Sequence, residues 1–184
     1  THEDVLFFTN YGKVYRIRGH QIPEYSRTSK GIPAINLLKM DQDEKIRSII
    51  SINNKSNELT DEHSLVFATK QGITKRVYLS EFARINQNGK IAIGLKEDDE
   101  LIDVKLTDGN AEIFIASSNG KVVRFNESDV RCMGRTASGV KGINVGDGEV
   151  VGVATSLEGK YILVISEYGY GKMSAMEDYR LTKR

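Results

Sequence analysis

The sequence predicts an all-β protein built from about four repeats of a short β-hairpin, arranged as a propeller-like ring or a β-solenoid. The first hairpin spans residues 5–16, where an apolar run, a turn at Gly12 and a second extended run follow one another. Glycine suits this turn because it can adopt a positive φ. Because no stretch combines helical periodicity, caps and helical length, we expect no long helix.

The hairpin pattern returns three times. The later copies lie at 65–76, 113–124 and 162–173, and their turn glycines are Gly72, Gly120 and Gly169. A polar insertion at 53–63 explains why the first spacing is the longest. We therefore expect a single domain over 1–184, divided into units at 4–52, 63–107, 111–156 and 160–184, the last of them incomplete. The alternative is that the hairpins are unrelated and alike by chance. The copies argue against it, because their similarity continues into the segments that follow each hairpin.

Each hairpin is followed by a polar connection, which we interpret as a loop or a single helical turn ending in an apolar plug. Next comes a segment rich in Gly, Lys and Arg, with copies at 26–31, 84–90, 134–142 and, broken off, 181–184. The first three units then close with an acidic turn and an apolar strand, at 43–50, 99–104 and 148–153. The partial alternation of these closing strands is typical of strands half buried between neighbouring sheets.

Composition excludes several classes of protein. The single Cys132 excludes a disulfide framework within one chain and fits a reducing cytoplasm. No apolar run approaches the roughly 18 residues of a membrane helix, and no secretory signal opens the chain. Three scattered histidines make a zinc site unexpected. A start without Met suggests an excised fragment.

The charges are segregated within each unit. The net charge of +1 alone predicts no polyanionic partner, but bases come early in a unit and acids gather late, at 41–44, 97–100 and 147–149. Units that stack or close into a ring would align the bases as a stripe. In the Gly/Lys/Arg segments, a base beside exposed backbone N–H groups could bind phosphate. A mixed solvated surface, with these segments as solvated turns, is the alternative.

No catalytic motif is present. The chain lacks a G-x-x-x-x-G-K-[ST] loop, a G-x-S-x-G elbow and an H-E-x-x-H pair, so we expect no enzymatic activity and no cofactor in this chain. The acidic clusters could bind a divalent cation, but acids of this kind are usually solvated. Tyr11, Tyr15, Tyr25 and Tyr78 could stack on bases, but their strand and plug positions favour packing.

Several segments together resemble a known family. They are residues 5–16, 22–24, 26–33, 88–93, 97–101, 133–142 and 169–172. Their order, across nearly the whole chain, resembles the C-terminal domain of the DNA gyrase A protein, with its topoisomerase IV counterpart as the close competitor. The resemblance implies a β-pinwheel, a ring of four-stranded blades that exchange strands, here a partial or open ring. The Q-x-R-G-G-x-G box of gyrase is absent, which leaves open both the choice of paralogue and wrapping by this piece alone.

The resemblance also implies a function. It is that of a DNA-binding and DNA-wrapping module of a bacterial type II topoisomerase, which bends duplex DNA around a basic outer rim to direct negative supercoiling. The candidate DNA-binding residues are Arg16, Arg18, Arg27, Lys30, Lys75, Arg76, Arg84, Lys90, Arg124, Arg131, Arg135, Lys141 and Lys172.

The implied partners are double-stranded DNA, the gyrase B protein and the rest of the gyrase A protein in a heterotetramer, located in the cytoplasm with the nucleoid. ATP and Mg²⁺ would belong to that parent complex, and the DNA-cleaving tyrosine to another domain. A non-catalytic protein-interaction propeller is the rival hypothesis, and it expects bases scattered around the ring.

Overall fold

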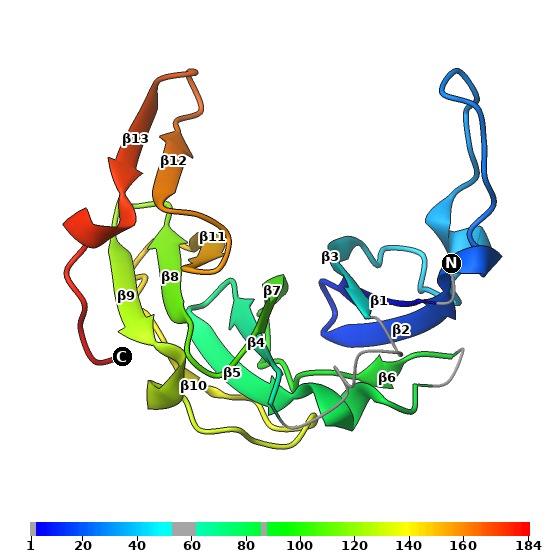
Figure 1. The fold of residues 1–184 in the computed structure, drawn as a ribbon, viewed down its shortest axis with the longest axis horizontal. Helices are drawn as coiled ribbons and strands as arrows, with labels where there is room; N and C mark the ends of the chain where they lie inside the picture. Colours follow the sequence, from blue (N-terminus) through cyan, green and yellow to red (C-terminus); the bar gives the residue numbers. More distant parts are fainter. Residues whose placement is uncertain (1–2, 53–61, 86–87) are drawn as a thin grey trace.

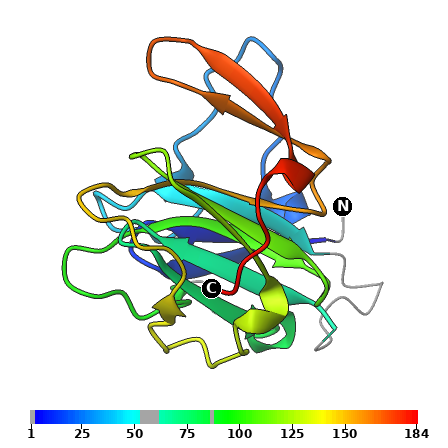
Figure 2. The same cartoon turned by 90° about the vertical axis from the view of Figure 1, so that its left-hand side faces the viewer.

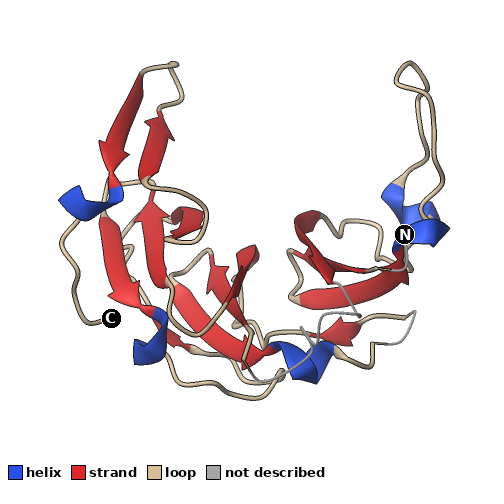
Figure 3. Ribbon diagram, viewed as in Figure 1, coloured by secondary structure: helices blue, strands red, loops and turns tan. Residues whose placement is uncertain are grey.

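The computed structural model describes residues 3–52, 62–85 and 88–184. Within these ranges the chain is all-β and forms an open arc, with the N-terminal unit at one end and the C-terminal hairpin at the other (Figure 1). Its only helices there are single 3₁₀ turns (Figure 3). The predicted fold class is therefore confirmed. No helix in the described ranges is long and apolar enough to cross a membrane.

All four predicted hairpins form. They are β1 (Asp4–Thr9) with β2 (Lys13–Arg18), β4 (Ser64–Thr69) with β5 (Ile73–Tyr78), β8 (Glu112–Ser117) with β9 (Val122–Asn126), and β12 (Tyr161–Ile165) with β13 (Gly171–Ala175). The φ angles of the turn glycines are 71°, 86°, 78° and 83° in chain order, as the tight turns require. Most of the polar insertion at 53–63 lies outside the described residues, as do Asn86 and Gln87 of the second Gly/Lys/Arg segment.

The predicted helical turns follow each hairpin. They are η1 (Gly19–Gln21), η3 (Leu79–Phe82), η4 (Glu127–Asp129) and η5 (Met176–Asp178), and the first unit adds η2 (Ala34–Asn36). The plug is clearest in η3, where the buried Phe82 ring packs edge-on against Phe8 and stacks on Phe67. Closing strands β3 (Ile46–Ile52), β7 (Leu101–Thr107) and β11 (Val150–Thr155) lie nearest the concave side of the arc (Figure 1).

Neighbouring units exchange a strand. Short strands β6 (Lys90–Ile91) and β10 (Val140–Lys141) come from the second and third units but pair with β2 and β5 of the unit before. The sheets are therefore ordered β3-β1-β2-β6 and β10-β5-β4-β7, followed by β11-β8-β9 and the β12-β13 pair. Two sheets thus have the four strands that the β-pinwheel resemblance implied. The β12-β13 hairpin and the connection between η1 and η2 project from the open side of the arc (Figures 1 and 2).

The hydrophobic core lies between successive sheets. Strand β4 is buried on both faces: Leu65 and Phe67 belong to the cluster shared with the first sheet, whereas Val66 and Ala68 belong to the cluster shared with the third. Burial on both faces explains why β4 is a continuous apolar run rather than an alternating one. Each large side chain buried here contributes about 1.5–3 kcal/mol by leaving water.

We expect Phe67→Ala to lower the free energy of unfolding by about 3–5 kcal/mol, because it opens a cavity among three rings at the junction of two sheets. Ile49→Ala is the matched control, since that side chain is 59% exposed and its loss should cost about 0.5 kcal/mol or less. Urea denaturation followed by circular dichroism measures both. Equal midpoints for the two variants would contradict this account of the core.

Candidate nucleic-acid interface

Two basic segments run along the convex side of the arc. We call residues 83–85 and 88–96 the second outer segment and residues 130–146 the third outer segment, after their units (Figure 1). Each contains one exchanged strand, β6 or β10, and each carries three bases and no acid. The bases are Arg84, Lys90 and Lys96 in the second outer segment, and Arg131, Arg135 and Lys141 in the third. The convex side therefore carries positive charge although the whole chain is nearly neutral.

The hairpin turns hold these segments in place. The Gly12 carbonyl accepts hydrogen bonds from the N–H groups of Ala92 and Ile93, at 2.8 and 3.2 Å. The Gly72 carbonyl accepts the equivalent pair from Gly142 and Ile143, at the same distances. A Cβ at Gly72 would lie 2.4 Å from the Ile143 carbonyl oxygen. These glycines are thus required for close approach as well as for positive φ, and the sequence revealed only the second reason.

Gly72→Ala should destabilise the protein more than Gly120→Ala. Both residues have positive φ, which costs alanine about 1–2 kcal/mol. Only Gly72 also meets a neighbouring backbone, whereas nothing lies within 4 Å of a Cβ at Gly120. Overpacking should add at least about 1 kcal/mol at Gly72. Denaturant midpoints of the two variants measure the difference, and an equal loss would show that the outer segment is not seated on this turn.

The predicted DNA-binding residues divide into three groups. The exposed ones are Arg18, Arg27, Lys30, Arg84, Arg131, Lys141 and Lys172. Three of these lie on the outer segments, together with the partly buried Lys90 and Arg135. Arg27 and Lys30 lie on the projecting connection of the first unit, and Lys172 lies on β13. Lys96 completes the basic set of the second outer segment, although the sequence motifs did not single it out.

The second group joins protein to protein. Arg16, Arg76 and Arg124 occupy the same register in three hairpins. Arg16 pairs with Asp4 and donates to the Ala83 carbonyl of the next unit. Arg124 pairs with Glu112 at 2.6 Å and donates to the Tyr179 carbonyl at 2.8 Å. Arg76 lies 3.5 Å from the fully buried Glu127 of the third unit. The base that ends these hairpins therefore ties one unit to the next.

Lys75 forms the third group alone. It is fully buried, and its Nζ donates to the carbonyls of Ala92, Ala137 and Arg135, at 2.9 and 3.0 Å for the first two. Nζ also lies 5.7 Å from the centre of the Phe67 ring. Burial, reinforced by the Arg135 guanidinium, lowers the pKa of Lys75 to about 7. Because Lys75 is fully buried, it cannot contact a phosphate and is not part of a DNA-binding surface.

The lowered pKa of Lys75 predicts how stability changes with pH. Between pH 7 and 10.5 the unfolded chain holds a proton that the folded chain has released. Lys75 therefore makes the free energy of unfolding rise with pH across this window, by at most about 1.4 kcal/mol per pH unit. Urea denaturation at pH 7, 8 and 9 measures the slope. Lys75→Met should remove this contribution, and an unchanged slope in that variant would contradict it.

Late acids of the second and third units pair with bases of the unit before, whereas Asp41 of the first unit pairs with Lys13 of its own unit. Arg47 lies 2.9 Å from Glu100, and Lys70 lies 3.1 Å from Glu149. In the part of the chain that the structure describes, no group of three or more His, Cys, Asp and Glu side chains could hold a metal ion. These two ion pairs therefore join the second unit to the first and the third unit to the second.

The four tyrosines do not behave alike. Tyr15 is buried as expected, and its hydroxyl donates to Glu44 at 2.9 Å. The expected packing is wrong for Tyr11, Tyr25 and Tyr78, which are 44%, 50% and 38% exposed. Tyr11 is exposed because it occupies a hairpin turn, and Tyr25 because it lies on the projecting connection.

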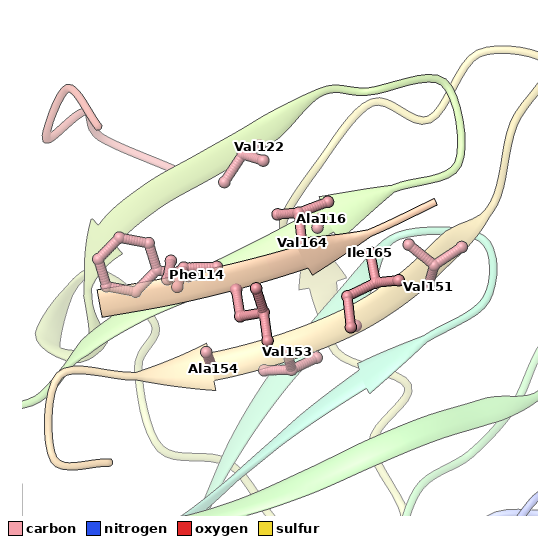
Figure 4. A pocket seen from close by; sticks show the side chains of 11 residues that line it. Phe114, Ala116, Val122, Val151, Val153, Ala154, Val164 and Ile165 are labelled. Atoms are coloured by element: carbon pink, nitrogen blue, oxygen red, sulfur yellow. The ribbon is translucent and has the colours of Figure 1, made fainter. Parts of the chain in front are cut away.

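An apolar hollow separates the third sheet from β12. It has a volume of about 350 Å³, and its lining includes Phe114, Val153 and Ile165 (Figure 4). The other labelled side chains around it are also apolar, so no set of polar groups converges on a ligand (Figure 4). The hollow is a gap between two successive blades rather than a site with chemistry.

The strand exchange and the ring-like succession of blades define a β-propeller-like domain. The family described as "DNA gyrase C-terminal domain, beta-propeller" matches residues 3–53, 63–108, 111–156 and 160–184. The chain therefore belongs to the family of DNA gyrase C-terminal domains.

Relatives agree with this family. The DNA gyrase A protein of Staphylococcus epidermidis is 52% identical over 187 residues, and that of Ureaplasma parvum is 53% identical over 185. Each match covers all of this chain and 21% of the relative, so the chain spans about a fifth of those proteins. The resemblance to gyrase A is thus confirmed.

Solved structures give the same result for the fold. The C-terminal domain of DNA topoisomerase IV matches with a TM-score of 0.87 at 29% identity, over all of this chain and 56% of that one. The DNA gyrase A C-terminal domain matches with a TM-score of 0.80 at 28% identity, over all of this chain and 58% of that one. Topoisomerase IV is therefore a close structural relative, whereas the relatives at half identity are gyrase proteins.

Proposed function

We propose that this chain is a DNA-wrapping module of a bacterial DNA gyrase, and that the duplex follows the convex side of the arc. The observation that carries the proposal is that two successive outer segments each carry three bases and no acid. Strand exchange seats both segments in the same way, through paired hydrogen bonds to a hairpin-turn carbonyl. Equivalent seating sets the two basic segments one after the other along the curve. The rival interaction propeller would instead require bases scattered around the ring.

The bases would bind phosphates rather than read sequence. Arg84, Arg131 and Lys141 are exposed, and Lys90 and Arg135 are partly exposed beside them. Arg18, Arg27, Lys30 and Lys172 extend the candidate set toward the two ends of the arc. Contacts to phosphate oxygens carry no sequence information, so binding should be nearly independent of sequence. Bending 20–30 base pairs by 40–90° costs about 1–6 kcal/mol, which added contacts along the curve would offset.

In the whole protein, wrapping would fix the handedness of the DNA crossing presented for strand passage, which would make supercoiling directional. The gyrase B protein and the rest of the gyrase A protein would complete the heterotetramer in the cytoplasm, close to the nucleoid. ATP and Mg²⁺ would act in those parts, and this chain would contribute no catalytic group. The four units expected at 4–52, 63–107, 111–156 and 160–184 would form one domain for this purpose.

Binding should be strong at low salt and fall steeply as salt is added. Fluorescence anisotropy with a random-sequence duplex of about 40 base pairs, roughly four helical turns, tests this. The logarithm of affinity should fall linearly with the logarithm of salt concentration, with a slope of about −0.9 for each phosphate contacted. No binding even at low salt would overturn the proposal and favour the interaction propeller.

A matched pair of variants locates the interface. The triple variant Arg84→Ala, Arg131→Ala, Lys141→Ala should flatten the salt slope by about three contacts. The control, Lys39→Ala, Lys45→Ala, Lys160→Ala, removes three exposed bases that lie outside both outer segments, and should leave the slope close to that of the unmodified protein. Equal losses in both variants would show that the convex side has no special role.

A further inference from the structure

Lys75 joins two outer segments that come from different units. Its Nζ donates to the Ala92 carbonyl in the second outer segment and to the Arg135 and Ala137 carbonyls in the third. The side chain is fully buried, and its hydrogen-bond acceptors are carbonyls rather than a carboxylate. A buried ammonium is costly to desolvate, so three well-placed acceptors are what make its burial acceptable.

The two outer segments meet directly above Lys75. The Gly94 N–H donates to the Ala137 carbonyl at 3.2 Å, and Arg135 Nη1 donates to the Ile91 carbonyl at 3.2 Å. A Cβ on Gly94 would lie 2.6 Å from the Thr136 carbonyl oxygen, so the two backbones are in close contact. The end of one basic segment is thereby fixed against the turn of the next.

We propose that Lys75 is the positioning residue that holds the second and third outer segments in contact, so that their bases form one continuous strip. Its consequence for DNA rests on the function proposed above, whereas its structural part does not. Lys75 is not itself a DNA ligand, since it has no exposed surface. It acts by fixing where Arg135 and the neighbouring bases lie.

The same register position is filled differently in the first unit. Tyr15, like Lys75, lies three residues after the turn glycine. A Cβ on Gly89 of the next outer segment would lie 2.7 Å from the Tyr15 ring, just as a Cβ on Gly139 would lie 3.1 Å from the Lys75 Cβ. Both side chains therefore support a following outer segment. The Tyr15 hydroxyl, however, donates to Glu44 of its own unit, whereas the Lys75 ammonium reaches two outer segments at once.

The protonation state of Lys75 should control the junction. An ammonium has three N–H donors for the three carbonyls, whereas the neutral amine has two. The groups facing Nζ are the Phe67 ring from β4, these three carbonyls and the Arg135 guanidinium, which together with burial favours the neutral form. Opening the contact would return Lys75 to water and restore its ordinary pKa, so loss of the proton as the pH rises should stabilise the contact between the segments, even though the amine keeps only two donors.

The test is Lys75→Met, which keeps an unbranched apolar stem and removes the donors. Amide hydrogen exchange should show protection of the Gly94 N–H falling by about tenfold or more, with the amides of β1 and β8 unchanged. Lys141→Met is the control, because it removes an exposed base of the third outer segment and should leave Gly94 protection as it was. Unchanged protection of Gly94 in Lys75→Met would overturn the proposal.

Binding to duplexes of two lengths distinguishes a residue that positions the outer segments from one that contributes charge to DNA binding. Lys75→Met should weaken binding to a duplex of about 40 base pairs several-fold but leave binding to a duplex of about 10 base pairs, one helical turn, unchanged. Lys141→Met should weaken both. If the unmodified protein binds neither duplex, the proposed function fails, while the exchange result still decides the role of Lys75.

The unmodified protein offers a second measurement in case Lys75→Met does not fold. Exchange of the Gly94 amide, corrected for the intrinsic pH dependence of exchange, should slow between pH 7 and 8.5, because release of the Lys75 proton favours the closed junction. Lys75→Arg, which stays charged, should abolish this change. A corrected rate that is flat with pH in the unmodified protein would contradict control by Lys75.

Discussion

The structure depends on the pairing of each short outer strand with the hairpin of the unit before it. β6 and β10 contribute only two residues each to their sheets, so the ladder alone is a weak attachment. The hairpin-turn carbonyls of Gly12 and Gly72 strengthen it by accepting two N–H groups apiece. Because no side chain can intervene at such short range, the attachment requires glycine. Without this attachment, the outer segments would lose their main-chain hydrogen bonds to the hairpins of the unit before.

Basic residues serve two different purposes in this fold. Those that end the hairpins, such as Arg16 and Arg124, have acidic partners in their own unit and carbonyl partners in the next. Those on the outer segments, such as Arg84 and Lys141, lie at the surface, and the outer segments themselves contain no acid. Other charges form ion pairs between units, as Lys70 does with Glu149. A near-neutral chain can therefore carry two basic segments on its convex side.

The repeat made much of the fold predictable. Hairpins, turn glycines and single helical turns are short-range features, and each left the same local signature in several units. The two-sided burial of β4 is also visible as its continuous apolar run from Leu65 to Ala68. The exposure of Tyr11 and Tyr25 was missed, because an aromatic side chain looks equally suited to a plug or to a turn when its neighbours in space are unknown.

The sequence by itself determined the all-β class, the four hairpins and the segregation of bases from acids within each unit. These follow from local periodicity, turn chemistry and charge order, which require no knowledge of distant contacts. Only the tertiary structure decided which bases face solvent. Lys75 and Lys172 both lie three residues after a turn glycine, yet Lys75 is fully buried and Lys172 is exposed. The difference arises because the third outer segment, which comes from another unit, covers β5. The local sequence around a residue does not indicate whether a distant segment will bury it.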